Sequence, residues 1–193
     1  MNQSIKFTAL LIFVLAACDK PMKKFEVERN PNPRMHYQVT MNINKSPGPF
    51  DEVKGFLTYR IENRQCVSED PISGVRATQA EWPEFELKKV SEDAYIGELY
   101  LDLFKGDDYY GLGVCQWKLQ SITITPTVNG NTFYLSATAE EIQRGNPTST
   151  YFLLEDYKNS SEPLKIFGAP LNENNKTKLD KFFSVTITGK EAF

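Results

Sequence analysis

Short runs in which apolar and polar residues alternate dominate this 193-residue chain. In the run from Ala94 to Phe104, Leu99 and Leu101 fall on one side and Glu98 and Asp102 on the other. A period of two places successive side chains on opposite faces of a strand, whereas an amphipathic helix repeats its apolar residues every three or four positions. The alternation therefore predicts a chain built mainly from β-strands, each with one face in a core.

Turn-forming residues separate the alternating runs. The clearest turn is Asn129-Gly130-Asn131, because Asn and Gly tolerate the positive φ that tight hairpins need. Many short strands between turns predict an antiparallel β-sandwich or a barrel-like version of it. We expect strands in these segments: Phe25–Arg29, His36–Ile43, Gly55–Asn63, Glu84–Val90, Ala94–Phe104, Trp117–Val128, Thr132–Thr138, Tyr151–Tyr157 and Phe182–Gly189.

One short helix is expected in this β-rich chain. Ala137–Arg144 has a helical composition over about two turns, and Gly145 follows it as a typical helix end. The stretch Asn159–Lys178 is rich in Asn, Ser and Pro, so we expect a long irregular connection there.

The N-terminus carries the pattern of an export signal. Lys6 precedes an uncharged run from Phe7 to Ala17. As a helix this run spans about 16 Å, too short for a hydrocarbon core of about 30 Å. A basic residue, a short apolar run and small residues in this order are typical of a secretory signal peptide.

The end of this signal, Leu15-Ala16-Ala17-Cys18, resembles a bacterial lipobox. The resemblance implies that Cys18 becomes the first residue of the mature protein and carries acyl chains, such as palmitate. An ordinary secretory signal with an unrelated Cys is the alternative. We expect a signal peptide over 1–17, a lipidated tether over 18–24 and a single β-rich domain over 25–193.

The location that follows is the cell envelope, with the domain anchored by lipid and facing the periplasm. Asp19 after the lipidated Cys is similar to an inner-membrane retention signal of enteric lipoproteins, and the choice between inner and outer membrane stays open. The chain has 22 basic and 25 acidic residues, a formal net charge of −3. This acidic balance disfavours a nucleic-acid partner.

Two cysteines remain in the predicted domain, Cys66 and Cys115. An exported protein with two thiols most simply forms one disulfide. The chain-entropy model gives roughly 4 kcal/mol for closing a loop of about 50 residues. Two buried free thiols are the alternative. A metal site is disfavoured because CxxC spacing is absent and the sole histidine, His36, lies far upstream.

The search for catalytic motifs leads to one unusual segment, Lys105–Trp117 (KGDDYYGLGVCQW). The sequence contains no GxSxG, no Walker A loop and no HExxH, so neither a nucleophile nor a cofactor is expected. Three interpretations of the segment are a Ca²⁺ site that uses its carboxylates, a glycosidase carboxylate pair and an acidic solvated loop. The fourth, a binding edge for a basic protein partner, is the one we adopt. Its expected contact residues are Asp107, Asp108, Tyr109 and Tyr110.

Several stretches together resemble a group of small Gram-negative lipoproteins found beside type VI secretion effectors. They are residues 59–66 (YRIENRQC), 71–74 (PISG), 108–117 (DYYGLGVCQW) and 182–186 (FFSVT). The resemblance implies a periplasmic immunity protein, not an enzyme, that binds and neutralises a toxic effector, in some cases a phospholipase. The alternatives are a structural or assembly lipoprotein of the envelope and a carboxylate-dependent hydrolase of cell-wall sugars.

Overall fold

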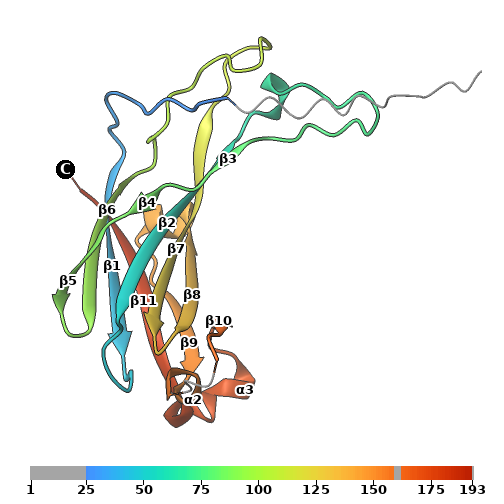
Figure 1. Cartoon of the computed structure of the whole chain (residues 1–193). Helices are drawn as coiled ribbons and strands as arrows, with labels where there is room; N and C mark the ends of the chain where they lie inside the picture. Colours follow the sequence, from blue (N-terminus) through green and yellow to red (C-terminus); the bar gives the residue numbers. More distant parts are fainter. Residues whose placement is uncertain (1–24, 159–161, 193) are drawn as a thin grey trace, which may run out of the picture.

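Two β-sheets pack face to face in the computed structural model, which describes residues 25–158 and 162–192 (Figure 1). Neighbouring strands are antiparallel in nearly every pair. The strands are β1 (His36–Asn44), β2 (Glu52–Ile61), β3 (Ala80–Glu81), β4 (Glu84–Phe85), β5 (Leu87–Ser91), β6 (Ala94–Tyr100), β7 (Trp117–Val128), β8 (Asn131–Thr138), β9 (Thr148–Leu153), β10 (Lys165–Phe167) and β11 (Phe182–Glu191).

The first sheet has the strand order β5-β6-β1-β11-β9, and the second has β10-β8-β7-β2-β3 with β4 also on β2. Alternation decides which side chains face inward: Val39 and Met41 of β1 are fully buried, and Thr40 between them is not. The inward side chains of both sheets form one core. We call these two sheets and their core the body. A mainly β fold is thus confirmed.

Two segments cross between the sheets and close the sides of the body. On one side β4 pairs with β2, and one residue later β5 pairs with β6 of the other sheet. On the opposite side β10 pairs with β8, and then Ala169 forms a bridge to Tyr151 of β9. The two backbone hydrogen bonds of this bridge are 2.9 and 3.1 Å long. The sandwich is therefore barrel-like, as the sequence predicts.

The predicted hairpin and helix are both present. Asn129 and Gly130 join β7 to β8 with φ values of 52° and 81°. Helix α1 (Ala139–Arg144) begins two residues later than predicted, because Thr138 is its N-cap. The Thr138 hydroxyl accepts from the Glu141 amide at 3.2 Å, and the Glu141 carboxylate accepts from the Thr138 amide at 2.7 Å. This reciprocal capping box satisfies two of the free donors at the helix start.

The segment Phe25–Arg29, predicted as a strand, is not one. Arg29 makes a single bridge to Phe104, and the rest of the segment pairs with no strand. The apolar side chain of Phe25 instead packs against aromatic rings of the connection between β6 and β7.

The C-terminal third holds more regular structure than predicted. The stretch Asn159–Lys178 contains β10 and the short helix α3 (Glu173–Lys176) where an irregular connection is expected. The strand predicted over Tyr151–Tyr157 ends at Leu153 as β9, and helix α2 (Leu154–Lys158) takes its second half. The body therefore carries three short α-helices among the described residues, in place of the single one predicted.

The predicted disulfide joins Cys66, in the 3-10 turn Arg64–Cys66, to Cys115 just before β7. Their Cα atoms are 5.4 Å apart, an ordinary separation for a disulfide. None of the helices in the described part of the chain is long and apolar enough to cross a membrane. The predicted signal peptide 1–17 and tether 18–24, with Cys18 and Asp19, lie outside the described residues.

Candidate functional site

Three segments extend beyond one end of the body, where β1 begins and where β2 and β6 end (Figure 1). They are residues 25–35, residues 62–79, which we call the arm, and residues 101–116, which we call the β6–β7 loop. Together we call them the loop end. It contains all the residues that the sequence singles out as a partner-binding site, so its construction decides what that site can do.

The disulfide and one asparagine attach the arm to the β6–β7 loop. Beside the Cys66–Cys115 bond, the Asn63 side-chain amide donates to the Val114 carbonyl at 2.8 Å. The Asn63 side-chain oxygen accepts from the Gln116 amide at 2.7 Å. A backbone hydrogen bond from the Glu62 amide to the Gln116 carbonyl, 2.9 Å long, joins the same two segments. The base of the arm and the base of the loop are thus held by a covalent bond and by hydrogen bonds.

One carboxylate organises the remaining segment. Asp102 accepts hydrogen bonds from the backbone amides of Arg34 and Met35 at 2.9 and 3.0 Å. The Asn30 side chain donates to the Asp102 carbonyl at 3.0 Å. A few residues on, Lys105 pairs with Glu28 at 3.1 Å. Together with the antiparallel bridge between Arg29 and Phe104, these contacts fix residues 25–35 across the β6–β7 loop.

A cluster of aromatic rings underlies the loop end and joins it to the body core. Phe25 stacks on Tyr109 with ring centres 4.2 Å apart and meets the edge of Tyr110 at 5.1 Å. Tyr109 in turn lies 6.3 Å from Trp117, which belongs to the core. Offset and edge-to-face pairs of this kind add to the stabilisation from burial. The ring contacts of Phe25 thus attach the start of this segment, which the sequence predicted to pair as a strand.

The predicted acidic residues lie in the β6–β7 loop and are engaged within it. The Asp107 carboxylate bonds the Lys105 ammonium at 2.9 Å and the Asp108 amide at 2.8 Å. The Lys105 hydrogen bond, more than any other cause, lowers the pKa of Asp107 below its ordinary value. The Asp108 carboxylate accepts from the amides of Leu112 and Gly113 at 2.9 and 3.0 Å. It therefore holds the loop apex in one conformation.

The predicted tyrosines lie in the same loop, but their rings are half-buried. Tyr109 donates its hydroxyl to the Lys105 carbonyl at 2.8 Å. Burial raises the pKa of Tyr110 above its ordinary value. Both rings pack on Phe25 in the aromatic cluster. The structure brings all four predicted residues together in one loop, and their contact with a partner stays a prediction.

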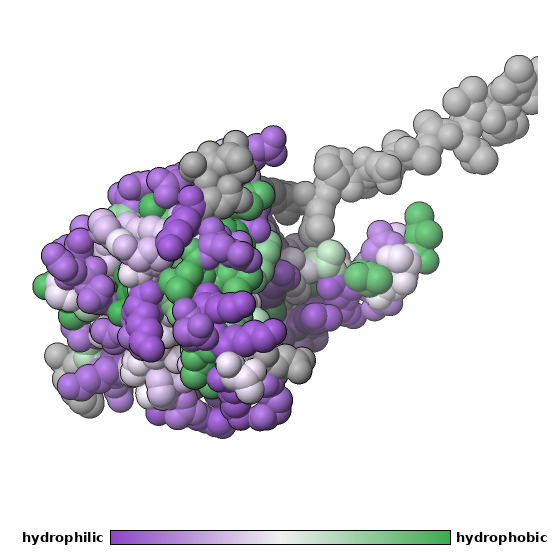
Figure 2. All heavy atoms as spheres, turned by 90° about the horizontal axis from the view of Figure 1, so that it is seen from below, coloured by the Kyte–Doolittle hydropathy of each residue, from purple (hydrophilic) through white to green (hydrophobic). Residues whose placement is uncertain are grey.

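Exposed aliphatic residues of the loop end are absent from the sequence-based site. Leu112, at the apex of the β6–β7 loop, and Val114, between the apex and Cys115, are 52% and 51% exposed. Ile72 and Val75 at the tip of the arm are 96% and 57% exposed. Figure 2 shows the arm extending from the body with apolar residues at its tip. The sequence could have indicated this exposure, because these apolar residues lie in Gly-containing turns outside every alternating run. No strand face is available there to bury them.

The carboxylates of the β6–β7 loop can be compared with what a metal site and a glycosidase site require. Among the described residues, no group of three or more His, Cys, Asp or Glu is placed to hold a metal ion. A glycosidase acid needs a raised pKa, and that of Asp107 is lowered. Asp156, whose pKa is raised by burial and then by Glu155, lies at the opposite end of the body in α2. The carboxylates of the β6–β7 loop thus fix the conformation of the loop itself.

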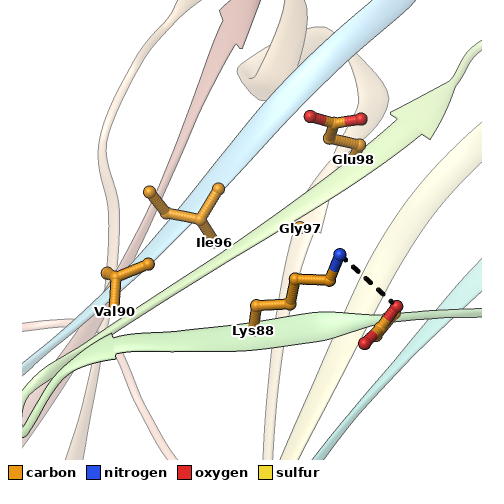
Figure 3. Close-up of a pocket in the computed structure, with 6 residues that line it drawn as sticks. Lys88, Val90, Ile96, Gly97 and Glu98 are labelled. Carbon is orange, nitrogen blue, oxygen red and sulfur yellow. Dashed lines mark ion pairs between the residues drawn. The ribbon is translucent and has the colours of Figure 1, made fainter.

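A separate depression lies on the outer face of β5 and β6 (Figure 3). Val90 and Ile96 supply its apolar part, and Lys88 forms a 3.9 Å ion pair with Glu86 at its side. Gly97 and Glu98 complete the lining. Its charged groups are already engaged in part, because Lys88 pairs with Glu86 and Glu98 lies 3.4 Å from His36, so we place the candidate site at the loop end.

Comparisons with protein-family models, with curated proteins and with solved structures find no match for this chain.

Proposed function

We propose that this protein is a lipid-anchored, periplasm-facing immunity protein that binds and neutralises a toxic secreted effector. The β6–β7 loop is the proposed contact surface. The proposal combines the lipobox-like Leu15-Ala16-Ala17-Cys18 ending with the sequence resemblance and with the construction of the loop end.

The observation that carries the binding role is a rigid loop with an exposed apolar apex. Asp108 caps the apex, the disulfide fixes its base, and Leu112 and Val114 point into solvent. Ordering a flexible loop on binding costs free energy, so a loop fixed before binding retains more of its contact energy. Exposed apolar residues on loops of a rigid scaffold are typical of recognition surfaces.

The negative charge of the β6–β7 loop supports a partner with a basic surface. The β6–β7 loop contains Asp102, Asp107 and Asp108 against a single cation, Lys105. Acidic surfaces speed the encounter with basic proteins, an effect that salt weakens. Replacing Asp107 and Asp108 together by Ala should slow association more than it speeds dissociation, and the difference should fade at high salt. A melting curve must accompany this variant, because Asp108 also holds the apex.

The deciding experiment uses the protein encoded next to this gene as the candidate effector. Sent to the periplasm, it should kill cells that lack this protein and spare cells that contain it. The double variant Leu112→Ser with Val114→Ser should lose protection and bind the purified effector at least tenfold more weakly. Val90→Ser, at a residue 57% exposed on β5, is the matched control and should retain both.

Two outcomes would contradict this proposal. Full protection by the folded double variant would remove the β6–β7 loop from the contact surface. A non-toxic partner from the cell's own envelope machinery would instead favour a structural or assembly role.

A further inference from the structure

We propose that the tip of the arm contacts the membrane surface to which the protein is anchored. The inference rests on the lipid anchoring at Cys18 that is part of the proposed function. It concerns a different surface from the β6–β7 loop, because the arm extends sideways from the body whereas the loop extends along its long axis (Figure 1).

The anchor and the arm start from the same place on the protein. Phe25, the first described residue, is seven residues after Cys18. An extended chain reaches at most about 3.5 Å per residue, so Cys18 lies within roughly 25 Å of Phe25. The Phe25 carbonyl accepts from the side chain of Gln79, at the base of the arm, at 3.2 Å. Ile72 is likewise seven residues from Gln79. Both Cys18 and Ile72 are therefore at most about 25 Å along the chain from the contact between Phe25 and Gln79.

The tip of the arm is apolar. Ile72 is 96% exposed, the highest value among the large apolar residues of the described chain, and Val75 lies three residues away. Apolar side chains gain about 1.5–3 kcal/mol each on full burial. That gain is too small to hold a free protein on a bilayer. It suffices for a second contact once an acyl anchor has raised the local concentration of the bilayer.

The charges near the tip are satisfied within the arm. The Asp70 carboxylate accepts from the Ile72 and Ser73 amides at 3.1 and 2.7 Å. Glu69 pairs with Arg76 at 3.1 Å. The same Arg76 also donates to the Val67 carbonyl at 2.7 Å. These contacts hold the turn in one conformation and leave the aliphatic side chains at its outermost point. The Glu69 charge is paired, and the Asp70 carboxylate is met by neutral donors only.

The orientation has a consequence for the proposed function. An arm resting on the bilayer keeps the loop end near the lipid surface. An effector that attacks phospholipids must come to the same surface, so the β6–β7 loop would meet it there.

The test uses the lipidated full-length mature protein in vesicles of phosphatidylethanolamine and phosphatidylglycerol that contain brominated phosphatidylcholine. Trp82 is first replaced by Phe to remove the exposed native indole. Two variants are then compared, Ile72→Trp and the control Val90→Trp on β5. We expect bromine to quench the Ile72→Trp emission at least twofold more strongly than the Val90→Trp emission.

Equal quenching of the two variants in protein that floats with the vesicles would overturn the arm contact and leave the anchor intact. Protein that does not float would overturn the anchor and the arm contact together, while effector binding in solution could still be measured. If quenching is equal and Ile72→Ser abolishes effector binding, the arm is a protein contact, which also overturns the inference.

Discussion

The body and the loop end of this protein are held together in different ways. In the body, Phe133 is fully buried and packs against Phe50, Phe152 and Phe183. In the loop end, Phe25 is half-buried and packs mainly on two tyrosines. The body obtains its stability from many equivalent apolar contacts. The loop end obtains its shape from one disulfide and a few hydrogen bonds between side chains and backbone.

Because of this difference, changes at exposed residues of the loop end should affect the stability of the body little. A core of many small contacts keeps its fold when outward-facing residues change, whereas a loop fixed by a few specific bonds can present exposed side chains in one arrangement. Removing the fixing contacts one at a time therefore tests whether the loop end responds separately from the body.

The largest effect is expected from the disulfide. Replacing Cys66 and Cys115 by Ser should lower the free energy of unfolding by about 4 kcal/mol, because the bond closes a loop with a sequence separation of 49 residues. The melting temperature should fall by several degrees. Amide hydrogen exchange at Gln116, whose N–H donates to Asn63, should rise more than exchange in β8, since local opening needs less free energy than global unfolding. An unchanged melting temperature would contradict this prediction.

The second effect concerns the aromatic cluster. Phe25→Ala should cost about 2 kcal/mol, below the 3–5 kcal/mol typical of a fully buried Phe, because this ring is half-buried. Near-ultraviolet circular dichroism should report the altered surroundings of Tyr109 and Trp117. Phe25→Leu is the control and should lose less. If Phe25→Ala alters the exchange of β8 as much as that of the β6–β7 loop, the loop end and the body form one cooperative unit.

The body could be predicted from the sequence because its strands show a regular alternation of apolar and polar residues, which can be read from a few neighbouring positions. Alternation alone groups Leu57, Tyr59 and Ile61 on one face of a strand, and that face of β2 is the buried one. Strand β10 could not be found in this way. It is three residues long, and the Asn131 side chain accepts from the Leu164 amide nearby at 3.1 Å. A contact between residues so far apart in sequence leaves no local pattern.

The sequence indicated which segment forms the candidate site, but it did not indicate what each of its side chains does. The segment Lys105–Trp117 stands out for its composition. Only the loop conformation shows that Asp108 bonds amides four and five residues ahead of it. That bond turns a residue expected to face a partner into one that shapes the loop. The same conformation exposes Leu112 and Val114, which the sequence separates from core residues only by their place in a Gly-containing turn outside every alternating run.

The third prediction tests that cap. Asp108→Ala removes the acceptor of the Leu112 and Gly113 amides and should cost about 1 kcal/mol, typical of an exposed hydrogen-bonding group. Exchange of these two amides should rise while the core strands are unaffected. Asp108→Asn retains a side-chain oxygen and should restore most of the protection. An equal loss in both variants would show that the negative charge matters more than the acceptor.

The smallest and most selective effect is expected at low pH. The Asp70 carboxylate accepts from the Ser73 backbone and hydroxyl and from the Ile72 backbone, which lowers its pKa below its ordinary value of 3.8. The Lys105 hydrogen bond lowers the pKa of Asp107 in the same direction. A carboxyl group whose pKa is lower in the folded state binds its proton more readily when unfolded. The stability that it contributes is therefore present above about pH 4 and is lost as the pH falls through the lowered value.

Both of these carboxylates belong to the loop end, whereas the buried polar side chains of β7 and β8, Thr125 and Asn131, do not titrate. In the body, the Thr138 hydrogen bonds lower the pKa of Glu141, and this carboxylate acts only at the start of α1. Acidification from about pH 6 to about pH 2.5 should therefore increase the mobility of the arm and the β6–β7 loop while the body stays folded. Pulsed hydrogen exchange, labelled at one common pH after acid exposure, can follow both regions. Asp70→Asn, which titrates at no pH, should remove the pH dependence of the arm and leave that of the β6–β7 loop. Simultaneous opening of the arm, the β6–β7 loop and β8 would show that the acid transition is global.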